Sequence, residues 1–323
     1  MVFTFRWKRK AMVEPVDQPQ PVPSIHGDLL PNIGWKKNVF KSSTESGEIV
    51  AKKVHRRWKL LESEVRMLDY ATRQLQVKGP RLRDVFLDGN DRVMVTDLDP
   101  GVQLHRVWKK INTANKKLII QQLRIEILKM RASTKPLIGR VAWDGDIEKD
   151  DPYHDPYHPD TTRYSVNYFG SECEFDAHKV EQMRARRGDA AAKALEDRIQ
   201  PLRDQYSDTF VLTHGDLHSQ NIHVRRVVGS DGTSRWELSG ILDWGCSGFY
   251  PKYMEYAMAM KTGPHRPYWK KVMKEVLKGM ECSRERMEVE EWATQWVGVV
   301  GMVWTFLERS CQDLSLLPHR QSR

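Results

Sequence analysis

Alternating apolar and polar residues mark short strands in the first hundred residues of the chain. Two β-prone runs, 37–41 and 48–54, flank Ser-Ser-Thr-Glu-Ser-Gly, which is typical of a hairpin turn. A second hairpin is predicted from the runs 84–87 and 92–96 around Asp-Gly-Asn-Asp. The segment 58–74 between the hairpins instead has apolar residues at helical spacing: Leu61, Val65, Leu68 and Ala71. The pattern therefore predicts two hairpins with one helix between them.

Helical spacing dominates most of the remaining chain. Residues 102–135 and 176–206 are predicted as helices, the second with Asp176 as its N-cap. The segment 139–175 between them is long and irregular, which is typical of a functional or mobile loop. Helices are also predicted at the C-terminal end, with core tryptophans at helical spacing: Trp269, Trp292, Trp296 and Trp304.

One stretch breaks this helical pattern with a strand, a tight loop and a hairpin. The apolar run 210–212 ends at His214-Gly215-Asp216, where a glycine lets the backbone turn and present a carboxylate. Asn221 then opens a second apolar run, and a returning strand at 236–242 follows a turn rich in Gly, Ser and Asp. We expect this strand to bring Asp243 beside Asn221.

The polar residues of this stretch suit phosphoryl transfer. Such a reaction needs hard oxygen ligands for Mg²⁺ and a carboxylate that orients or deprotonates the attacking hydroxyl. Asp216 is the candidate base, and Asn221 and Asp243 are the candidate metal ligands.

The sequence also contains a histidine cluster in this stretch and a second copy of its tripeptide. His214, His218 and His223 lie close together in sequence, so the stretch could be a histidine-rich metal site, although it contains no cysteine in the loop. The tripeptide His26-Gly27-Asp28 repeats the loop motif near the N-terminus, but no strand precedes it and Asn32 follows at the wrong spacing. We interpret this repeat as chance.

His-Gly-Asp-x-x-x-x-Asn followed by Ile-Leu-Asp-Trp resembles the aminoglycoside phosphotransferase and choline kinase family. The resemblance is strong over 210–255 and looser over the rest of 30–310. It implies an α+β, two-lobed protein-kinase-like fold, with a small antiparallel-sheet N-lobe and a mainly helical C-lobe. It also implies transfer of the γ-phosphoryl group of Mg²⁺-bound ATP to a hydroxyl of a small molecule.

The resemblance also suggests residues that bind the nucleotide. Val-Ala-Lys-Lys resembles the family's Val-Ala-x-Lys, and strand alternation favours Lys53 over Lys52 as the phosphate-steering lysine. Glu64 is the expected partner of this lysine, with Glu62 as second choice. Residues 32–37 match the turn that covers the phosphates, although Gly34 is their only glycine.

The same resemblance gives an adenine-binding hinge and the domain limits. Backbone groups of Asp97, Leu98 and Asp99 are expected to bind adenine, on position alone. The expected division is a flexible basic and proline-rich arm at 1–23, an N-lobe at 24–97 and a C-lobe at 98–323.

The motifs leave two other functions open. One is a kinase-like protein that binds nucleotide without phosphorylating anything, which the presence of all the motif residues disfavours. The other is a protein kinase, which the lack of an Ala-Pro-Glu segment after Asp243 disfavours.

Composition bounds the cellular setting and the partners. The chain has 323 residues, of which 40% are hydrophobic and 29% charged, as expected for a globular protein of one large core or two lobes. No run reaches membrane-spanning length, the first residues lack the apolar core of a secretion signal, and the four cysteines lack metal-like spacing. We expect a cytoplasmic protein with no membrane partner and leave its oligomeric state open.

The net charge of +9 permits nucleic-acid binding, but the basic residues fall in separate short runs without a recognisable nucleic-acid module. We therefore expect no specific nucleic-acid partner. Acidic residues concentrate instead in the irregular segment, at Asp144, Asp146, Glu148, Asp150, Asp151 and Asp155. Together with Trp143, Tyr153 and Tyr157 they suggest a cationic acceptor bound there, although the composition slightly favours a solvated surface loop that balances neighbouring Lys and Arg.

Overall fold

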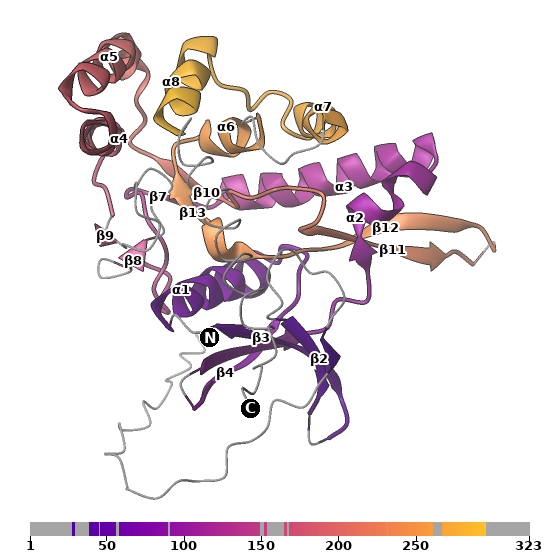
Figure 1. Ribbon diagram of the computed structural model, residues 1–323. Coiled ribbons are helices and arrows are strands. Elements are labelled where there is room, and N and C mark those ends of the chain that lie inside the picture. Colours follow the sequence, from indigo (N-terminus) through magenta and orange to yellow (C-terminus); the bar gives the residue numbers. More distant parts are fainter. Residues whose placement is uncertain are drawn as a thin grey trace, which may run out of the picture.

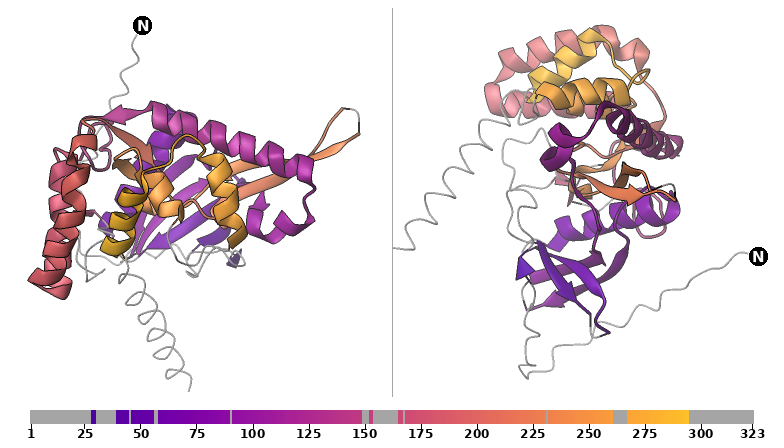
Figure 2. Two further views of the ribbon diagram at one scale, coloured as in Figure 1. Left: turned by 90° about the horizontal axis from the view of Figure 1, so that it is seen from above. Right: turned by 90° about the vertical axis from the view of Figure 1, so that its right-hand side faces the viewer.

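The structure, a computed structural model, shows two lobes stacked on one another (Figure 1 and the right-hand view of Figure 2). Strands β1 to β5 and helix α1 lie at one end, and helices α3 to α8 lie at the other. The structure describes residues 28–29, 39–44, 46–55, 58–89, 91–148, 152–153, 165–166, 168–230, 232–260 and 267–294.

The N-lobe is a five-stranded sheet in the order β1-β2-β3-β5-β4, with every pairing antiparallel. Its strands are β1 (Asp28–Leu29), β2 (Val39–Ser43), β3 (Ile49–His55), β4 (Leu82–Asp88) and β5 (Asp91–Asp97). Both predicted hairpins are confirmed. The predicted helix forms as α1 (Trp58–Asp69), which continues into a π-helical turn, Tyr70–Gln74. Val65 and Leu68 of α1 belong to the same hydrophobic core as the C-lobe, so this helix joins the two lobes.

In the described part of the chain the C-lobe contains two three-stranded sheets, the two-stranded sheet β8-β9 and seven further α-helices (Figure 1). The three-stranded sheets have the orders β12-β11-β6 and β13-β10-β7, and helix α3 packs against both β10 and β12. The helices are α2 (Leu104–Val107), α3 (Thr113–Ala132), α4 (Glu172–Arg187), α5 (Asp189–Ile199), α6 (Met254–Met260), α7 (Pro267–Val276) and α8 (Arg284–Thr294). The strands are β6 (Val102–Gln103), β7 (Thr134–Lys135), β8 (Pro152–Tyr153), β9 (Ser165–Val166), β10 (Phe210–Thr213), β11 (Ile222–Val228), β12 (Ser234–Ile241) and β13 (Gly248–Tyr250). The hairpin formed by β11 and β12 projects from the body of the lobe (Figures 1 and 2).

Two predicted helices differ from the observed ones. The segment 102–135 begins with strand β6, because Val102 and Gln103 pair with β11, and its long helix starts only at Thr113, after the N-cap Asn112. The helix predicted over 176–206 begins four residues earlier in the structure, since α4 starts at Glu172 with Ser171 as its N-cap. Asp176 is therefore not an N-cap but a buried residue inside the helix. Gly188, at a φ of +83°, then separates α4 from α5.

Candidate active site

The loop between β10 and β11 presents Asp216 at the meeting point of the two lobes. Gly215 has a φ of +77°, and a Cβ at this position would lie 2.6 Å from the carbonyl oxygen of Cys246. Only glycine fits both restrictions, so the turn that aims Asp216 depends on this residue. The side chain of Asp216 is about one-third exposed and so is open to a bound molecule.

Asn221 connects this loop to Asp243. Its Nδ2 donates to the backbone oxygen and to Oδ2 of Asp216, at 3.0 and 3.1 Å. The backbone nitrogen of Leu242 donates to the backbone oxygen of Asn221 at 2.9 Å, so the end of β12 lies against the start of β11. Asp243 follows with a left-handed backbone, φ 64° and ψ 72°. Such a conformation costs about 1–3 kcal/mol in a non-glycine residue and is concentrated at functional sites.

Lys53 joins the N-lobe sheet to both α1 and Asp243. Its Nζ donates to the two oxygens of Glu64 at 2.7 and 2.9 Å and to Oδ1 of Asp243 at 3.0 Å. Burial alone would lower the pKa of Lys53, but the charges of Asp243 and Glu64 outweigh it and raise that pKa well above its usual value. The lysine is therefore a permanent cation. The second choices do not make these contacts: Glu62 pairs with Arg66 at 3.3 Å, and Lys52 lies on the opposite face of β3.

The three histidines of this region do not converge on one point. The Nε2 of buried His214 donates to the backbone oxygen of Leu242 at 3.0 Å, and burial lowers its pKa. His218 Nε2 faces Asp216 Oδ2 at 3.4 Å. Burial tends to lower the pKa of His218, but its contact with Asp216 raises it overall. His223 Nδ1 donates to Asp99 at 3.1 Å, so this histidine connects β11 to the segment after β5. The geometry favours the oxygen-ligand interpretation over a histidine-rich metal site.

The expected adenine hinge follows β5. Asp97, its last residue, accepts a hydrogen bond from Arg83. The carboxylate of Asp99 is buried and accepts from His223, Ser239 and the backbone nitrogen of Gly101. Burial would raise the pKa of Asp99, but the bonds from His223 and Ser239 outweigh it and lower that pKa. Leu98 between them is half-buried. Asp99 thus ties this segment to β11 and β12, and its role in binding adenine stays a prediction. The expected phosphate-covering turn at 32–37 lies outside the described residues.

The comparisons with known proteins agree with this arrangement. Residues 29–272 match the family model described as the phosphotransferase enzyme family, which is more than half of the chain. The chain belongs to the phosphotransferase enzyme family. It is a phosphotransferase with an alcohol group as acceptor, as its motifs predict. No curated protein sequence matches this phosphotransferase.

Solved structures of low sequence identity share its fold. The apo form of a thermostable mutant of aminoglycoside phosphotransferase APH(4)-Ia is 12% identical, with a TM-score of 0.54 over 86% of this chain and 85% of that chain. A ternary complex of such a mutant with AMP-PNP and hygromycin B is also 12% identical, with a TM-score of 0.52 over 79% and 83%. A third, with ADP and hygromycin B, is 10% identical, with a TM-score of 0.53 over 86% and 90%. The two-lobed protein-kinase-like fold is therefore confirmed.

Glu255, in α6, holds the loop that carries Asp216 in this phosphotransferase, and no motif in the sequence points to it. Its buried carboxylate accepts from the backbone nitrogens of His214 and Gly215, at 2.6 and 3.2 Å. The one signal in the sequence is an acidic residue in the otherwise apolar run Tyr-Met-Glu-Tyr-Ala. Burial raises the pKa of Glu255 to about 7, although the two backbone bonds oppose this.

This pKa predicts a pH dependence of stability. Glu255 binds its proton more tightly in the folded than in the unfolded chain, so its contribution is fully present below about pH 4.5 and is lost as pH rises through about 7. The size is at most about 3 kcal/mol. Chemical denaturation at pH 4.5 to 8 gives the free energy of unfolding of the parent and of Glu255→Gln. The contribution of Glu255 is the difference between the two in how steeply this free energy changes with pH. Glu288→Gln, at a side chain that is 54% exposed, is the control. A Glu255→Gln slope equal to that of the parent would contradict the expectation.

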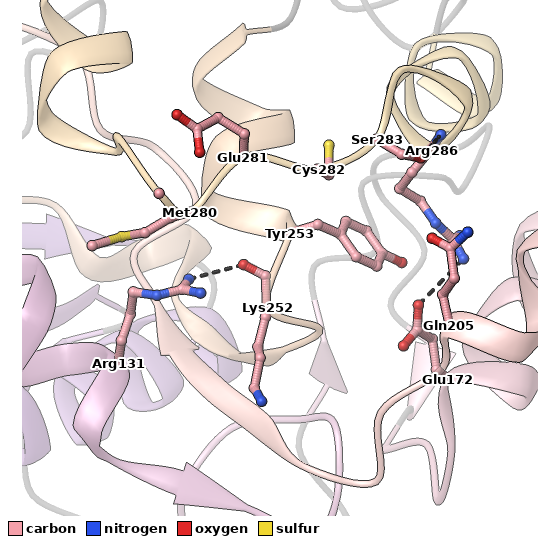
Figure 3. A pocket seen from close by; sticks show the side chains of 11 residues that line it. Arg131, Glu172, Gln205, Lys252, Tyr253, Met280, Glu281, Cys282, Ser283 and Arg286 are labelled. Carbon is pink, nitrogen blue, oxygen red and sulfur yellow. Dashed lines mark hydrogen bonds and ion pairs between the residues drawn. The ribbon is translucent and has the colours of Figure 1, made fainter.

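Two cavities lie away from these residues. One, of about 350 Å³, lies among α3, α4, α8, the residues just before α6 and the connection from α7 to α8. Its lining mixes cations such as Arg131 and Lys252 with Glu172 and Glu281 (Figure 3). The other, of about 310 Å³, lies beside the hinge. Neither is lined by Asp216 or Asp243.

Proposed function

We propose that this phosphotransferase transfers the γ-phosphoryl group of Mg²⁺-bound ATP to a hydroxyl of a small molecule, with Asp216 as the base. The observation that carries this is the joining of Lys53, Glu64 and Asp243 across the lobes, next to the loop that aims Asp216. Phosphoryl transfer depends mainly on positioning and on electrostatic stabilisation, and these groups supply both. The relatives crystallised with ADP or AMP-PNP support a nucleotide as donor.

The proposed metal ligands fit Mg²⁺ chemically. Asn221 uses its Nδ2 on Asp216, which leaves its Oδ1 as the coordinating atom, and the side chain of Asp243 is half exposed. Both are hard oxygen donors of the kind that Mg²⁺ prefers. Bound magnesium would neutralise charge on the phosphates. Mg²⁺ usually binds one or two protein oxygen ligands together with substrate phosphates and water, which fits the pair Asn221 and Asp243.

Lys53→Ala is expected to lower kcat/KM by about 10²-fold or more, because it removes the cation that steers the phosphates in a site where such charges act strongly. Lys52→Ala is the matched control, since it changes the neighbouring residue of β3 on the opposite face. Steady-state kinetics with varied nucleotide measures the difference. Equal losses in the two variants would show that neither lysine has the proposed role.

The acceptor is proposed to be a small molecule, with cationic compounds tested first. Trp143 is 56% exposed beside Asp144 and Asp146, and exposed aromatic and acidic groups can contact an ammonium. Lys135 lies 3.7 Å from Asp146 and offsets part of this charge. The remaining acidic residues of the segment, including Asp150, Asp151 and Asp155, lie outside the described residues. Two of the relatives carry hygromycin B as a bound small molecule.

The test is ATP consumption by the full chain with a panel of hydroxyl compounds. The panel should pair each amine-bearing alcohol with a neutral analogue of the same size. ATP consumption that depends on a panel compound and on Mg²⁺ would support the proposal, and phosphorylated product identifies the acceptor. Binding of nucleotide without turnover would favour the silent nucleotide-binding alternative, and label transferred from ATP to generic proteins would favour a protein kinase.

A further inference from the structure

A basic cavity lies beside the hinge, between the linker 76–81, Pro100 and the β11–β12 hairpin; we call it the linker cavity. Its volume is about 310 Å³. The charged side chains that line it are Lys78, Arg81 and Arg225, and no carboxylate lines it. Three cations that converge without an acidic partner repel one another, which favours an anion between them.

These cations are not neutralised by their neighbours. In the described part of the chain neither Arg81 nor Arg225 forms an ion pair, although Glu237 is the cross-strand neighbour of Arg225. Glu237 instead accepts a hydrogen bond from Arg235. The Nζ of Lys78 donates to the backbone oxygen of Leu238, at 3.3 Å, which holds it against the wall of the cavity.

Two buried carboxylates behind the wall are also occupied. Glu126 accepts from Lys129 and from the backbone nitrogen of Lys78, a lining residue. Asp99 accepts from Ser239, a lining residue, and from His223 and Gly101. Its charge is therefore already hydrogen-bonded inside the protein, and it leaves the cavity basic.

The three cations come from both lobes. The backbone oxygen of Arg81 accepts from Asp97 of β5, so Arg81 is fixed to the N-lobe sheet. The backbone of Lys78 instead bonds to Ile241 of β12 and to Glu126 of α3, so Lys78 is fixed to the C-lobe, as is Arg225 on β11. An anion held by all three would connect the lobes beside the hinge.

We propose that the linker cavity binds a small molecule that carries two adjacent phosphate groups. Guanidinium groups bind phosphate oxygens through paired hydrogen bonds, and an ammonium adds a point charge. A cavity of about 310 Å³ is at the lower end of the range for small-ligand sites and is larger than one phosphate needs. A diphosphate can reach cations on both sides of it.

Calorimetric titration of the full chain with inorganic pyrophosphate tests the proposal, in the absence of Mg²⁺ so that the metal ligands Asn221 and Asp243 do not contribute. Ionic strength is held constant with NaCl. The double variant Arg81→Ala/Arg225→Ala is expected to weaken Kd about tenfold or more, because two charge-assisted contacts are lost. Arg226→Ala is the matched control, since Arg226 is adjacent in β11, exposed, and bonded to Ser234. Its Kd should equal that of the parent.

The thermal midpoint gives a second measurement, because a ligand that binds only the folded state raises it. Pyrophosphate should raise the midpoint of the parent and of Arg226→Ala more than that of the double variant, and orthophosphate should act more weakly than pyrophosphate. Equal affinity of the double variant and the parent would overturn the proposal. So would an Arg226→Ala loss as large as that of the double variant, or no binding at all. None of these results depends on phosphoryl transfer, so each can be distinguished from failure of the proposed activity.

Discussion

Asp216→Asn is expected to lower kcat about 10²–10⁴-fold while it leaves nucleotide affinity nearly unchanged. An amide cannot take the proton of the attacking hydroxyl, but it keeps the size of the carboxylate. Asn221 donates to Asp216, so an amide oxygen in the same place can still accept that bond and keep the loop in position. Steady-state kinetics and direct nucleotide titration separate the two effects.

Asp243→Asn is the matched comparison for Asp216→Asn. It changes the proposed metal ligand, so it should remove the Mg²⁺-dependent part of nucleotide binding as well as turnover. A tenfold or greater loss of nucleotide affinity in Asp216→Asn would contradict the role of base. Unchanged metal dependence in Asp243→Asn would contradict the role of ligand.

Lys179→Met is expected to destabilise the fold by about 3–5 kcal/mol, because it removes one of the two cations that balance the buried carboxylates of Glu172, Asp176 and Glu290. Lys179 is fully buried and donates to Asp176 at 2.9 Å and to Glu290 at 2.6 Å, so it ties α4 to α8. Arg286 is the second cation of this buried group and also contacts Glu172, whose pKa is raised by burial (Figure 3). With Lys179 gone, Arg286 alone must balance the remaining carboxylates.

Lys193→Met is the control for the buried lysine. Lys193 pairs with Asp197 at 2.6 Å, but both side chains are more than 60% exposed, at 68% and 61%. Such an exposed pair contributes little to stability, because water and salt screen it. Chemical denaturation followed by circular dichroism compares the two variants with the parent. If both variants lose the same small free energy, the buried group does not hold α4 to α8.

The sequence predicted the elements whose signal is local. Alternation and turn residues located both N-lobe hairpins and the β11–β12 hairpin, and Gly215 marked the turn that its φ of +77° now explains. Alternation along β3 also selected Lys53, because it placed this residue and Ala51 on one face. Among the described residues, no helix is both long and apolar enough to cross a membrane.

Local signals failed where a long-range contact decides the structure. Val102 and Gln103 have a helix-compatible pattern, but they pair with β11 and form a strand. Asp176 is a residue type that often caps helices, yet it lies inside α4. The positive charges of Lys179 and Arg286 offset the cost of burying its carboxylate there. Propensity is a weak preference, and tertiary pairing outweighs it.

By itself the sequence determined the two N-lobe hairpins, strands β10 to β12, the loop motif around Asp216 and the residue types that phosphoryl transfer needs. Only the tertiary structure decided which of them meet. Lys53 and Asp243 are separated by 190 residues, and they come within 3.0 Å because the two lobes pack around α1. Glu255 left only one weak signal in the sequence and the linker cavity left none, because burial and the convergence of charges from distant segments are properties of the packed chain.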